Sequence, residues 1–264
     1  MIISDKEKFV FVHIPKCAGT SVRSRIEHLD DRSGAYSGRL EQHPELGLLN
    51  YVHLPLQTLY DHFPAEFECI KSYRSVAVLR DPSKRFVSSI AQYCNRYTNT
   101  DIRSHTRETL RKEVRNVIDA LEGYEDEAPG ARLPAEFIHF QRQRDYTHIR
   151  DRKIIDHLVE ITHVESMLLS LLGAEALRGD AAIKANESRV YRSAGIQVLA
   201  SVGRRLAPGL GALLPGNLSK WVRDNLYSPL NHQFEDVFED EVVRTFIASY
   251  YAGDITLFNE ARPS

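Results

Sequence analysis

Residues 9–12 (FVFV) form an apolar run that gives way to a polar loop and then to an amphipathic segment. The run has no helical spacing, which is typical of a strand buried in a parallel sheet. Beyond the loop, Val22, Ile26 and Leu29 recur at i, i+4 and i+7, so a helix begins near Thr20 with its apolar stripe toward a sheet. The pattern therefore predicts a strand, a loop and a helix N-terminus.

A second stretch, residues 76–93, repeats this order. An apolar strand at 76–79 is followed by Arg80, by Asp81 at a helix-capping position and by Pro82 in the first helical turn. The apolar stripe of the helix that follows consists of Phe86, Ile90 and Tyr93. The two stretches thus predict two strand-to-helix connections of the same kind.

The rest of the chain alternates in the same way. Patterns of apolar residues predict a strand at 48–52, helices at 56–62 and 104–122, the second ended by Gly123, a strand and a helix within 154–172, and a long helix at 236–251. Residues 30–47 are rich in Gly, Asp, Ser and Arg and indicate a loop near the strand ends. Residues 195–232 mix apolar and cationic residues and are broken by prolines.

These elements predict a single α/β domain over residues 1–264. We expect a P-loop-like three-layer fold with a central parallel sheet flanked by helices, and a helical C-terminal part. Residues 195–232 are interpreted as a helical lid or insertion that covers an acceptor cleft or rests on a membrane surface.

The amino-acid composition indicates an ordinary globular protein. The 264 residues are 42% hydrophobic and 27% charged with a net charge of −2, as in ordinary globular proteins, and this balance argues against nucleic acid as a partner. Three widely spaced cysteines disfavour a disulfide framework and a zinc cluster and suit a reducing compartment. The N-terminus shows no signal peptide. We expect a cytoplasmic, bacterial enzyme, peripheral to the inner face of the membrane if 195–232 contacts lipid.

The first strand-to-helix connection has the chemistry of an oxyanion site. A helix N-terminus supplies backbone N–H groups and the positive end of the helix dipole, Lys16 adds a charge, and Gly19 permits close backbone approach. The pattern differs from the P-loop G-x-x-x-x-G-K-[ST] because Lys16 precedes the single glycine. Carboxyl ends of parallel strands share one edge, so Arg80, with Ser88 and Ser89 close by, is expected near Lys16. Two cationic strand ends predict a ligand with two anionic groups.

These stretches resemble the PAPS-dependent sulfotransferases, most closely the carbohydrate branch that contains heparan sulfate 2-O-sulfotransferase. HIPKCAGTS resembles that family's 5′-phosphosulfate loop, H-x-P-K-T-G-G-T-S, and LRDPSKRFVSS resembles its 3′-phosphate segment, L-R-D-P-x-x-R-x-x-S. The ending YYAGDITLFNEA resembles the terminal Y-x-x-D-x-x-L-Y. The resemblance implies a 5′-phosphosulfate loop of Lys16, Cys17, Ala18, Gly19, Thr20 and Ser21, and a 3′-phosphate site of Arg80 and Ser88. Residues 183–192 resemble the family's later N-x-S stretch near the nucleotide, which makes Asn186 and Ser188 further cofactor-binding candidates. Cys17 and Ala18 depart from the commoner Thr-Gly.

The resemblance also implies a general base. His53 follows the predicted strand 48–52 and precedes a short helix, which is where this family carries the histidine that takes the acceptor's proton. Imidazole titrates near neutral pH and suits that role. A histidine that only caps the short helix is the alternative. Lys16 is expected to assist catalysis by balancing charge during in-line transfer, with PAP as product and without a metal ion.

Candidate acceptor-binding residues lie in the segment 135–152. Residues 135–152 lie where the family has an acceptor-side segment, and four side chains there suit an anionic acceptor, namely Gln141, Arg142, Arg144 and Tyr146. A charged surface helix over residues 135–152 is the alternative explanation of this sequence. The branch implies a carbohydrate or glycolipid hydroxyl. Three other readings stay open: a P-loop-type kinase, a catalytically silent nucleotide-binding protein, and a structural α/β protein.

Overall fold

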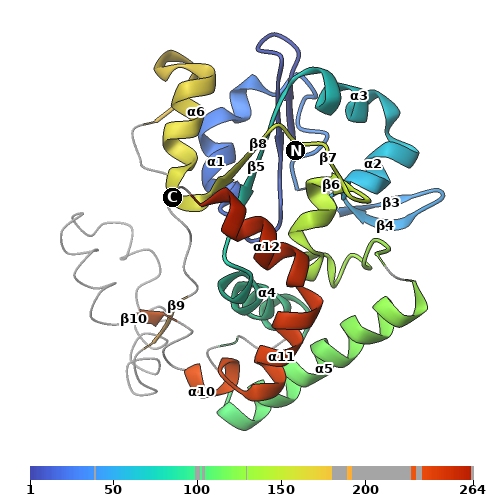
Figure 1. Ribbon diagram of the computed structural model, residues 1–264, viewed down its shortest axis with the longest axis vertical. Helices are drawn as coiled ribbons and strands as arrows, with labels where there is room; N and C mark the ends of the chain where they lie inside the picture. Colours follow the sequence, from blue (N-terminus) through green and yellow to red (C-terminus); the bar gives the residue numbers. More distant parts are fainter. Residues whose placement is uncertain are drawn as a thin grey trace, which may run out of the picture.

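The computed structural model describes residues 1–38, 40–98, 102, 105–128, 130–179, 189–191, 227–229 and 234–262. At its centre lies a four-stranded sheet in the order β1-β2-β5-β8 (Figure 1). Its strands are β1 (Ile2–Ser4), β2 (Phe9–Val12), β5 (Arg74–Leu79) and β8 (His157–Glu160). β2, β5 and β8 run parallel, and β1 pairs antiparallel with β2. The expected parallel sheet therefore carries one antiparallel edge strand.

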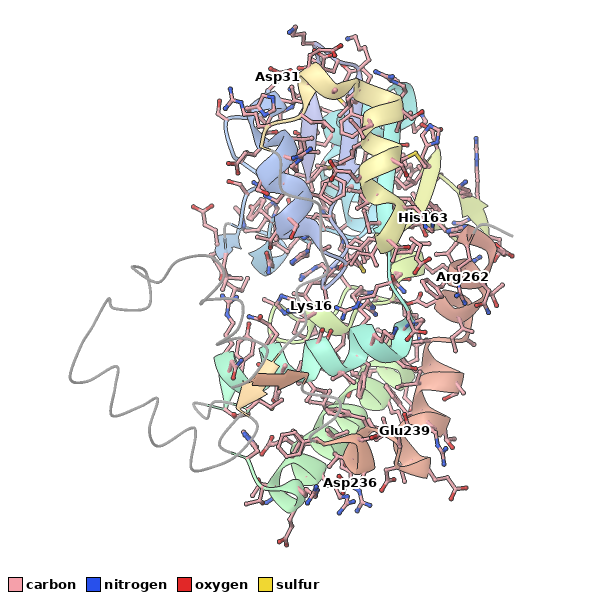
Figure 2. All side chains as sticks on the ribbon, turned by 90° about the vertical axis from the view of Figure 1, so that its left-hand side faces the viewer. Lys16, Asp31, His163, Asp236, Glu239 and Arg262 are labelled. Atoms are coloured by element: carbon pink, nitrogen blue, oxygen red, sulfur yellow. The ribbon has the colours of Figure 1, made fainter. Side chains whose placement is uncertain are left out.

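Helices cover both faces of this sheet. α1 (Gly19–Ile26) and α6 (Val164–Leu172) lie on one face, while α2 (Leu56–His62) and α3 (Pro64–Ser72) lie on the other (Figures 1 and 2). α12 (Ala252–Ala261) packs beside the edge strand β8. Short 3-10 turns follow α1 at Glu27–Leu29 and flank α6 at Ile161–His163 and Ala174–Ala176. Parallel strands flanked by helices agree with the expected α/β class.

A second, helical part lies below the sheet in Figure 1. α4 (Pro82–Tyr97) leaves the end of β5 and packs with α5 (Arg107–Glu127), α10 (Glu235–Phe238) and α11 (Glu241–Tyr250). Their apolar faces enclose a core separate from that of the sheet, with members such as Phe86, Ile90, Val114, Leu121, Phe140, Phe246 and Tyr251. The expected helical C-terminal part is thus present, and α4 and α5 complete it.

The start of α4 follows from its sequence. The carboxylate of Asp81 accepts a hydrogen bond from the backbone N–H of Lys84 (2.9 Å), and Pro82 occupies the first turn, where its missing N–H costs nothing. Phe86 and Ile90 are buried. α4 starts in such a direction that Ser88, in its second turn, lies beside Arg80 at the end of β5.

The predicted strand 48–52, which would place His53 at a third strand end of the central sheet, does not join that sheet. β4 (Gly47–Asn50) pairs antiparallel with β3 (Leu40–His43), which lies in the stretch expected to be a loop, and the two form a separate hairpin. The sequence of a short apolar strand does not show which strand it pairs with, because the same residues can be buried in a hairpin or in a parallel sheet.

Three helix predictions also need correction. α5 continues through Gly123 to Glu127, because its buried stripe outweighs the roughly 1 kcal/mol that an interior glycine costs. The predicted helix 236–251 is two helices, separated where the Asp240 carboxylate caps α11 at Val242 N–H (3.0 Å). Residues 135–152 form no charged surface helix. They contain the 3-10 turns η3 (Ile138–Phe140) and η4 (Gln143–Tyr146) and the hairpin of β6 (His148–Ile149) and β7 (Arg152–Lys153).

The proposed lid at 195–232 lies outside the described residues, apart from β10 (Tyr227–Pro229), which pairs antiparallel with β9 (Arg189–Tyr191). Among the helices that the structure describes, none has the length and apolar character needed to cross a membrane.

Candidate active site

The loop between β2 and α1 occupies the carboxyl edge of the sheet, and Figure 2 shows Lys16 between the sheet and α4. Lys16 and Ala18 both adopt the left-handed region, with φ of 64° and 57°. Ala18 is the residue before α1, and no side chain caps this helix end. The first turn of a helix has no intrahelical acceptors for its N–H groups, and such helix N-termini are common anion-binding sites.

Gly19 is required by its neighbour His13. A Cβ atom on Gly19 would lie 1.7 Å from His13 Nε2, so only glycine leaves room for this buried imidazole. The structure thus gives Gly19 a packing role, and its role in close approach of an anion stays a prediction. The glycine also lets α1 begin directly against the ring that follows β2.

Arg80 and Lys16 converge as expected from the sheet geometry. Nη1 of Arg80 donates to the carbonyl oxygen of Lys16 (3.1 Å) and to Oγ of Ser88 (3.0 Å), although Lys16 and Arg80 are 64 positions apart. Nζ of Lys16 lies 3.4 Å from Oε1 of Gln92, one turn beyond Ser88 on α4. Burial and then the charge of Arg80 lower the pKa of Lys16. Such a partly desolvated pair of cations favours anion binding.

A buried amide supports this pair. Oε1 of Gln143 accepts the backbone N–H of Arg80 and Nε2 donates to the Arg80 carbonyl, both at 2.9 Å. The thiol of Cys17 donates to the same Oε1 at 3.3 Å. Burial raises the pKa of Cys17 to about 12, so this thiol remains protonated and unreactive at neutral pH.

His53 reaches the same edge by a different route from the one expected. Its Nδ1 lies 3.0 Å from the carbonyl oxygen of His13. Because a carbonyl can only accept, Nδ1 carries the proton and Nε2 keeps its lone pair. Burial, and next the neighbouring His139, hold the pKa of His53 well below its usual range. The ring is therefore neutral at pH 7, with an unprotonated Nε2.

Two further imidazoles surround His53. The ring centroids of His13 and His139 lie 4.6 Å and 5.4 Å from that of His53. Burial, with Lys16 the next contribution, lowers the pKa of His139 to about 3. The carbonyl of His139 accepts hydrogen bonds from Arg85 Nη1 (3.1 Å) and Ser89 Oγ (2.8 Å), which fix its backbone to α4.

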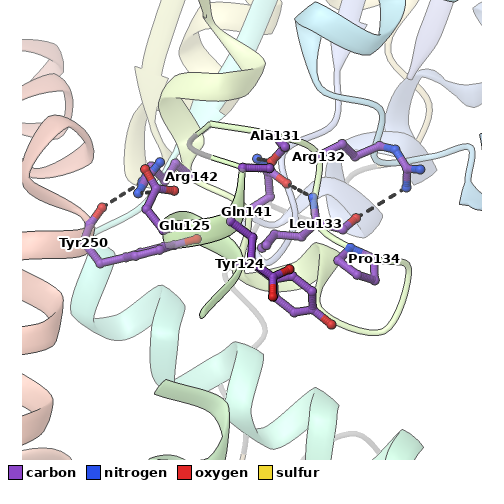
Figure 3. A pocket seen from close by; sticks show the side chains of 11 residues that line it. Tyr124, Glu125, Ala131, Arg132, Leu133, Pro134, Gln141, Arg142 and Tyr250 are labelled. Carbon is purple, nitrogen blue, oxygen red and sulfur yellow. Dashed lines mark hydrogen bonds and ion pairs between the residues drawn. The ribbon is translucent and has the colours of Figure 1, made fainter. Parts of the chain in front are cut away.

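Three of the four predicted acceptor residues, Gln141, Arg142 and Arg144, have hydrogen-bond or ion-pair partners within the protein. Arg142 pairs with Glu125 (2.9 Å) and lies over the ring of Tyr250, 4.2 Å from its centroid (Figure 3). Gln141 accepts the N–H of Leu133 (2.7 Å), and both Gln141 and Arg142 line a surface pocket that none of Lys16, Arg80 and His53 lines. Arg144 pairs with Asp151 (3.2 Å), and Tyr146 is buried. Their role in acceptor binding stays a prediction.

The remaining predicted contacts divide into two sets. Thr20 is exposed and Ser21 half-buried on the first turn of α1, and Ser88 is buried beside Arg80. Asn186 and Ser188 lie outside the described residues. Within the described residues, no group of three or more His, Cys, Asp and Glu side chains is placed to hold a metal ion.

Sequence reasoning missed four residues of this site: His13, Gln92, His139 and Gln143. His13 is part of the motif HIPKCAGTS, and Gln92 follows Ser88 by four positions on one face of α4, so both carried a local signal. His139 and Gln143 come from a segment far along the chain and are brought to the site only by tertiary packing.

Comparison with known proteins identifies the family. Searches of curated proteins and of solved structures found no match. A family model described as "Sulfotransferase family" matches residues 1–259. This match covers nearly the whole chain, including both cationic segments and the terminal helices, and the chain therefore belongs to the sulfotransferase family.

Proposed function

We propose that this protein transfers the sulfuryl group of PAPS to a hydroxyl acceptor, with His53 as general base. The observation that carries the proposal is the contact of Arg80 with the Lys16 carbonyl beside the open N-terminus of α1. It provides two cations, a helix dipole and backbone N–H groups within one small region. PAPS offers anionic groups at both its 5′ and its 3′ positions and so matches this arrangement.

The loop before α1 would hold the 5′-phosphosulfate. Lys16 supplies the charge, the backbone of Cys17, Ala18 and Gly19 supplies N–H groups, and the hydroxyls of Thr20 and Ser21 lie on the first turn of the helix. Arg80 and Ser88, already hydrogen-bonded to each other, would hold the 3′-phosphate.

His53 would take the proton of the acceptor hydroxyl. The hydrogen bond of Nδ1 to the His13 carbonyl leaves Nε2 as the acceptor atom. As the acceptor oxygen attacks sulfur and the bond to the 5′-phosphate oxygen breaks, negative charge grows on that leaving oxygen. Lys16 and the loop N–H groups are suited to stabilise this charge. The proton moves to His53, and PAP leaves as the second product.

The acceptor side is proposed to lie near His53 and His139. Because Arg142 and Arg144 already have carboxylate partners, these two arginines would have to exchange them to bind an anionic acceptor. A carbohydrate or glycolipid hydroxyl is the proposed acceptor class, on the resemblance to the carbohydrate branch.

Calorimetric titration with PAP, in parallel with ATP plus magnesium, tests the proposal. Binding of PAP in preference to ATP is expected, since a P-loop-type kinase would bind ATP with magnesium instead. PAP binding without transfer of radiolabelled sulfate from PAPS to any hydroxyl in an acceptor panel would favour the catalytically silent alternative. Failure to bind PAP would overturn the proposal.

A further inference from the structure

The side chain of Gln143 is buried between the two cationic segments and bonds to both polar backbone groups of one residue. Oε1 accepts the N–H of Arg80 and Nε2 donates to its carbonyl, each at 2.9 Å. This pairing occurs where β5 ends and the backbone leaves the sheet, so the amide replaces the neighbouring strand that would otherwise satisfy these groups.

The orientation of this amide is fixed by its neighbours. The Cys17 thiol donates to the same oxygen at 3.3 Å, so two donors converge on Oε1. Reversing the amide would place its NH₂ group against both the Arg80 N–H and the thiol, and its oxygen against the Arg80 carbonyl. The amide therefore holds Arg80 in a single arrangement.

Gln143 is itself held firmly. Its backbone N–H donates to Oδ2 of the buried Asp254 (2.8 Å), and Asp254 Oδ1 accepts the N–H of Arg144 (2.9 Å). Nη2 of Arg85 lies 3.6 Å from the same carboxylate. Because α12 carries Asp254 and α4 carries Arg85, the segment of Gln143 is anchored to both helices before any ligand binds.

We propose that Gln143 is a positioning residue that sets the selectivity of the site for a 3′-phosphate by fixing the backbone of Arg80. This rests on the proposed function. The guanidinium of Arg80 is already aimed by its bonds to Ser88 and to the Lys16 carbonyl, and those bonds require the Arg80 backbone to stay in place. Without the Gln143 amide, two partly buried backbone groups of Arg80 lose their protein partners, and the residue shifts to find others.

Two glutamines of the same segment allow a matched experiment. Gln141 is also buried and makes three hydrogen bonds, to Leu133 N, Ala131 O and Asp145, but none of these partners belongs to the anion site. Gln143→Met and Gln141→Met remove equivalent amides from residues two positions apart. Affinities for PAP and for 5′-AMP, which lacks the 3′-phosphate, are measured by calorimetry or competition well below the melting temperature of each variant.

Gln143→Met is expected to lower the PAP affinity about tenfold while changing the 5′-AMP affinity about twofold or less. Gln141→Met is expected to leave the ratio of the two affinities unchanged. A purely structural role would lower both affinities together or would affect both variants alike, and either result overturns the inference. An unchanged PAP affinity in Gln143→Met also overturns it. If the wild-type protein binds no PAP, the proposed function fails instead, so the two failures are distinguishable.

Discussion

Nη1 of Arg80 donates a hydrogen bond to the backbone carbonyl of Lys16 over 3.1 Å, so the two cationic segments contact each other directly. The guanidinium satisfies the carbonyl of a residue whose φ is 64°, a conformation that non-glycine residues rarely adopt. The loop shape and the position of Arg80 therefore depend on each other. A change in either segment is therefore expected to affect both of the proposed anion-binding segments.

Gly19→Ala tests the contact between α1 and His13. The new Cβ would lie 1.7 Å from His13 Nε2, so the ring must move, and with it the carbonyl that orients His53. We expect a loss of about 2 kcal/mol in unfolding free energy and impaired turnover. Gly123→Ala is the control, because nothing lies within 4 Å of its Cβ, and it should stabilise the protein by about 1 kcal/mol. Denaturant unfolding measures both, and unchanged stability of Gly19→Ala would contradict the packing.

Ala18→Gly tests the strained loop. Alanine at φ 57° pays a steric cost that glycine avoids, so the substitution is expected to stabilise the protein by about 1 kcal/mol and to preserve PAP binding. The same change at Ala120, in the interior of α5, should destabilise by a similar amount, about 1 kcal/mol. If both variants lose stability in urea unfolding, the left-handed conformation of Ala18 is wrong.

His53→Gln tests the general base. Glutamine retains a hydrogen-bonding side chain but cannot take a proton, so sulfate transfer from PAPS should fall by about 100-fold or more while PAP affinity is unchanged. Since the pKa of His53 lies well below its usual range, the base remains deprotonated as the pH falls from about 8 to 6. The wild-type rate should therefore not decline as an unshifted imidazole would. A rate that halves near pH 6.5 would contradict a buried neutral base.

His139 should make stability depend on pH. Its pKa is about 3 in the folded protein and near 6.5 when unfolded, so below pH 6.5 the unfolded chain binds a proton that the folded chain does not. Unfolding free energy should thus fall as the pH decreases, by about 1.4 kcal/mol per pH unit from this residue alone. His139→Phe removes this contribution, and the stability difference between the two proteins should shift by about 2 kcal/mol between pH 6.5 and about 5. Parallel curves for the two proteins would rule this out.

Both cationic segments could be predicted from local sequence. The apolar run of β2, the cap at Asp81 and the stripes of α1 and α4 depend on residues a few positions apart, and the convergence of Lys16 and Arg80 follows from a general rule for parallel strands. The structure confirms these strands and helices and the contact between the two segments.

The positions of the other residues of the site depend on packing between segments that are distant in the sequence. Gln143 and His139 carry no local pattern that points to Arg80 or His53, and their places are set by bonds to Asp254, Arg85 and Ser89. Likewise, the spacing of cations in 135–152 does not reveal that Arg142 has Glu125 as a partner. Hydrogen-bond partners 50 to 111 positions away leave no pattern in a single sequence.

The most direct test of the account is the PAP affinity of wild-type protein, Lys16→Ala and Arg80→Ala, with Lys71→Ala as a control, because Lys71 is an exposed lysine paired with Glu68 on α3. Calorimetry should show PAP binding in the wild type and in the control, with a loss of about 100-fold in each of the two site variants. Equal PAP binding in all four proteins, or none in any, would contradict a nucleotide site formed by these two strand ends.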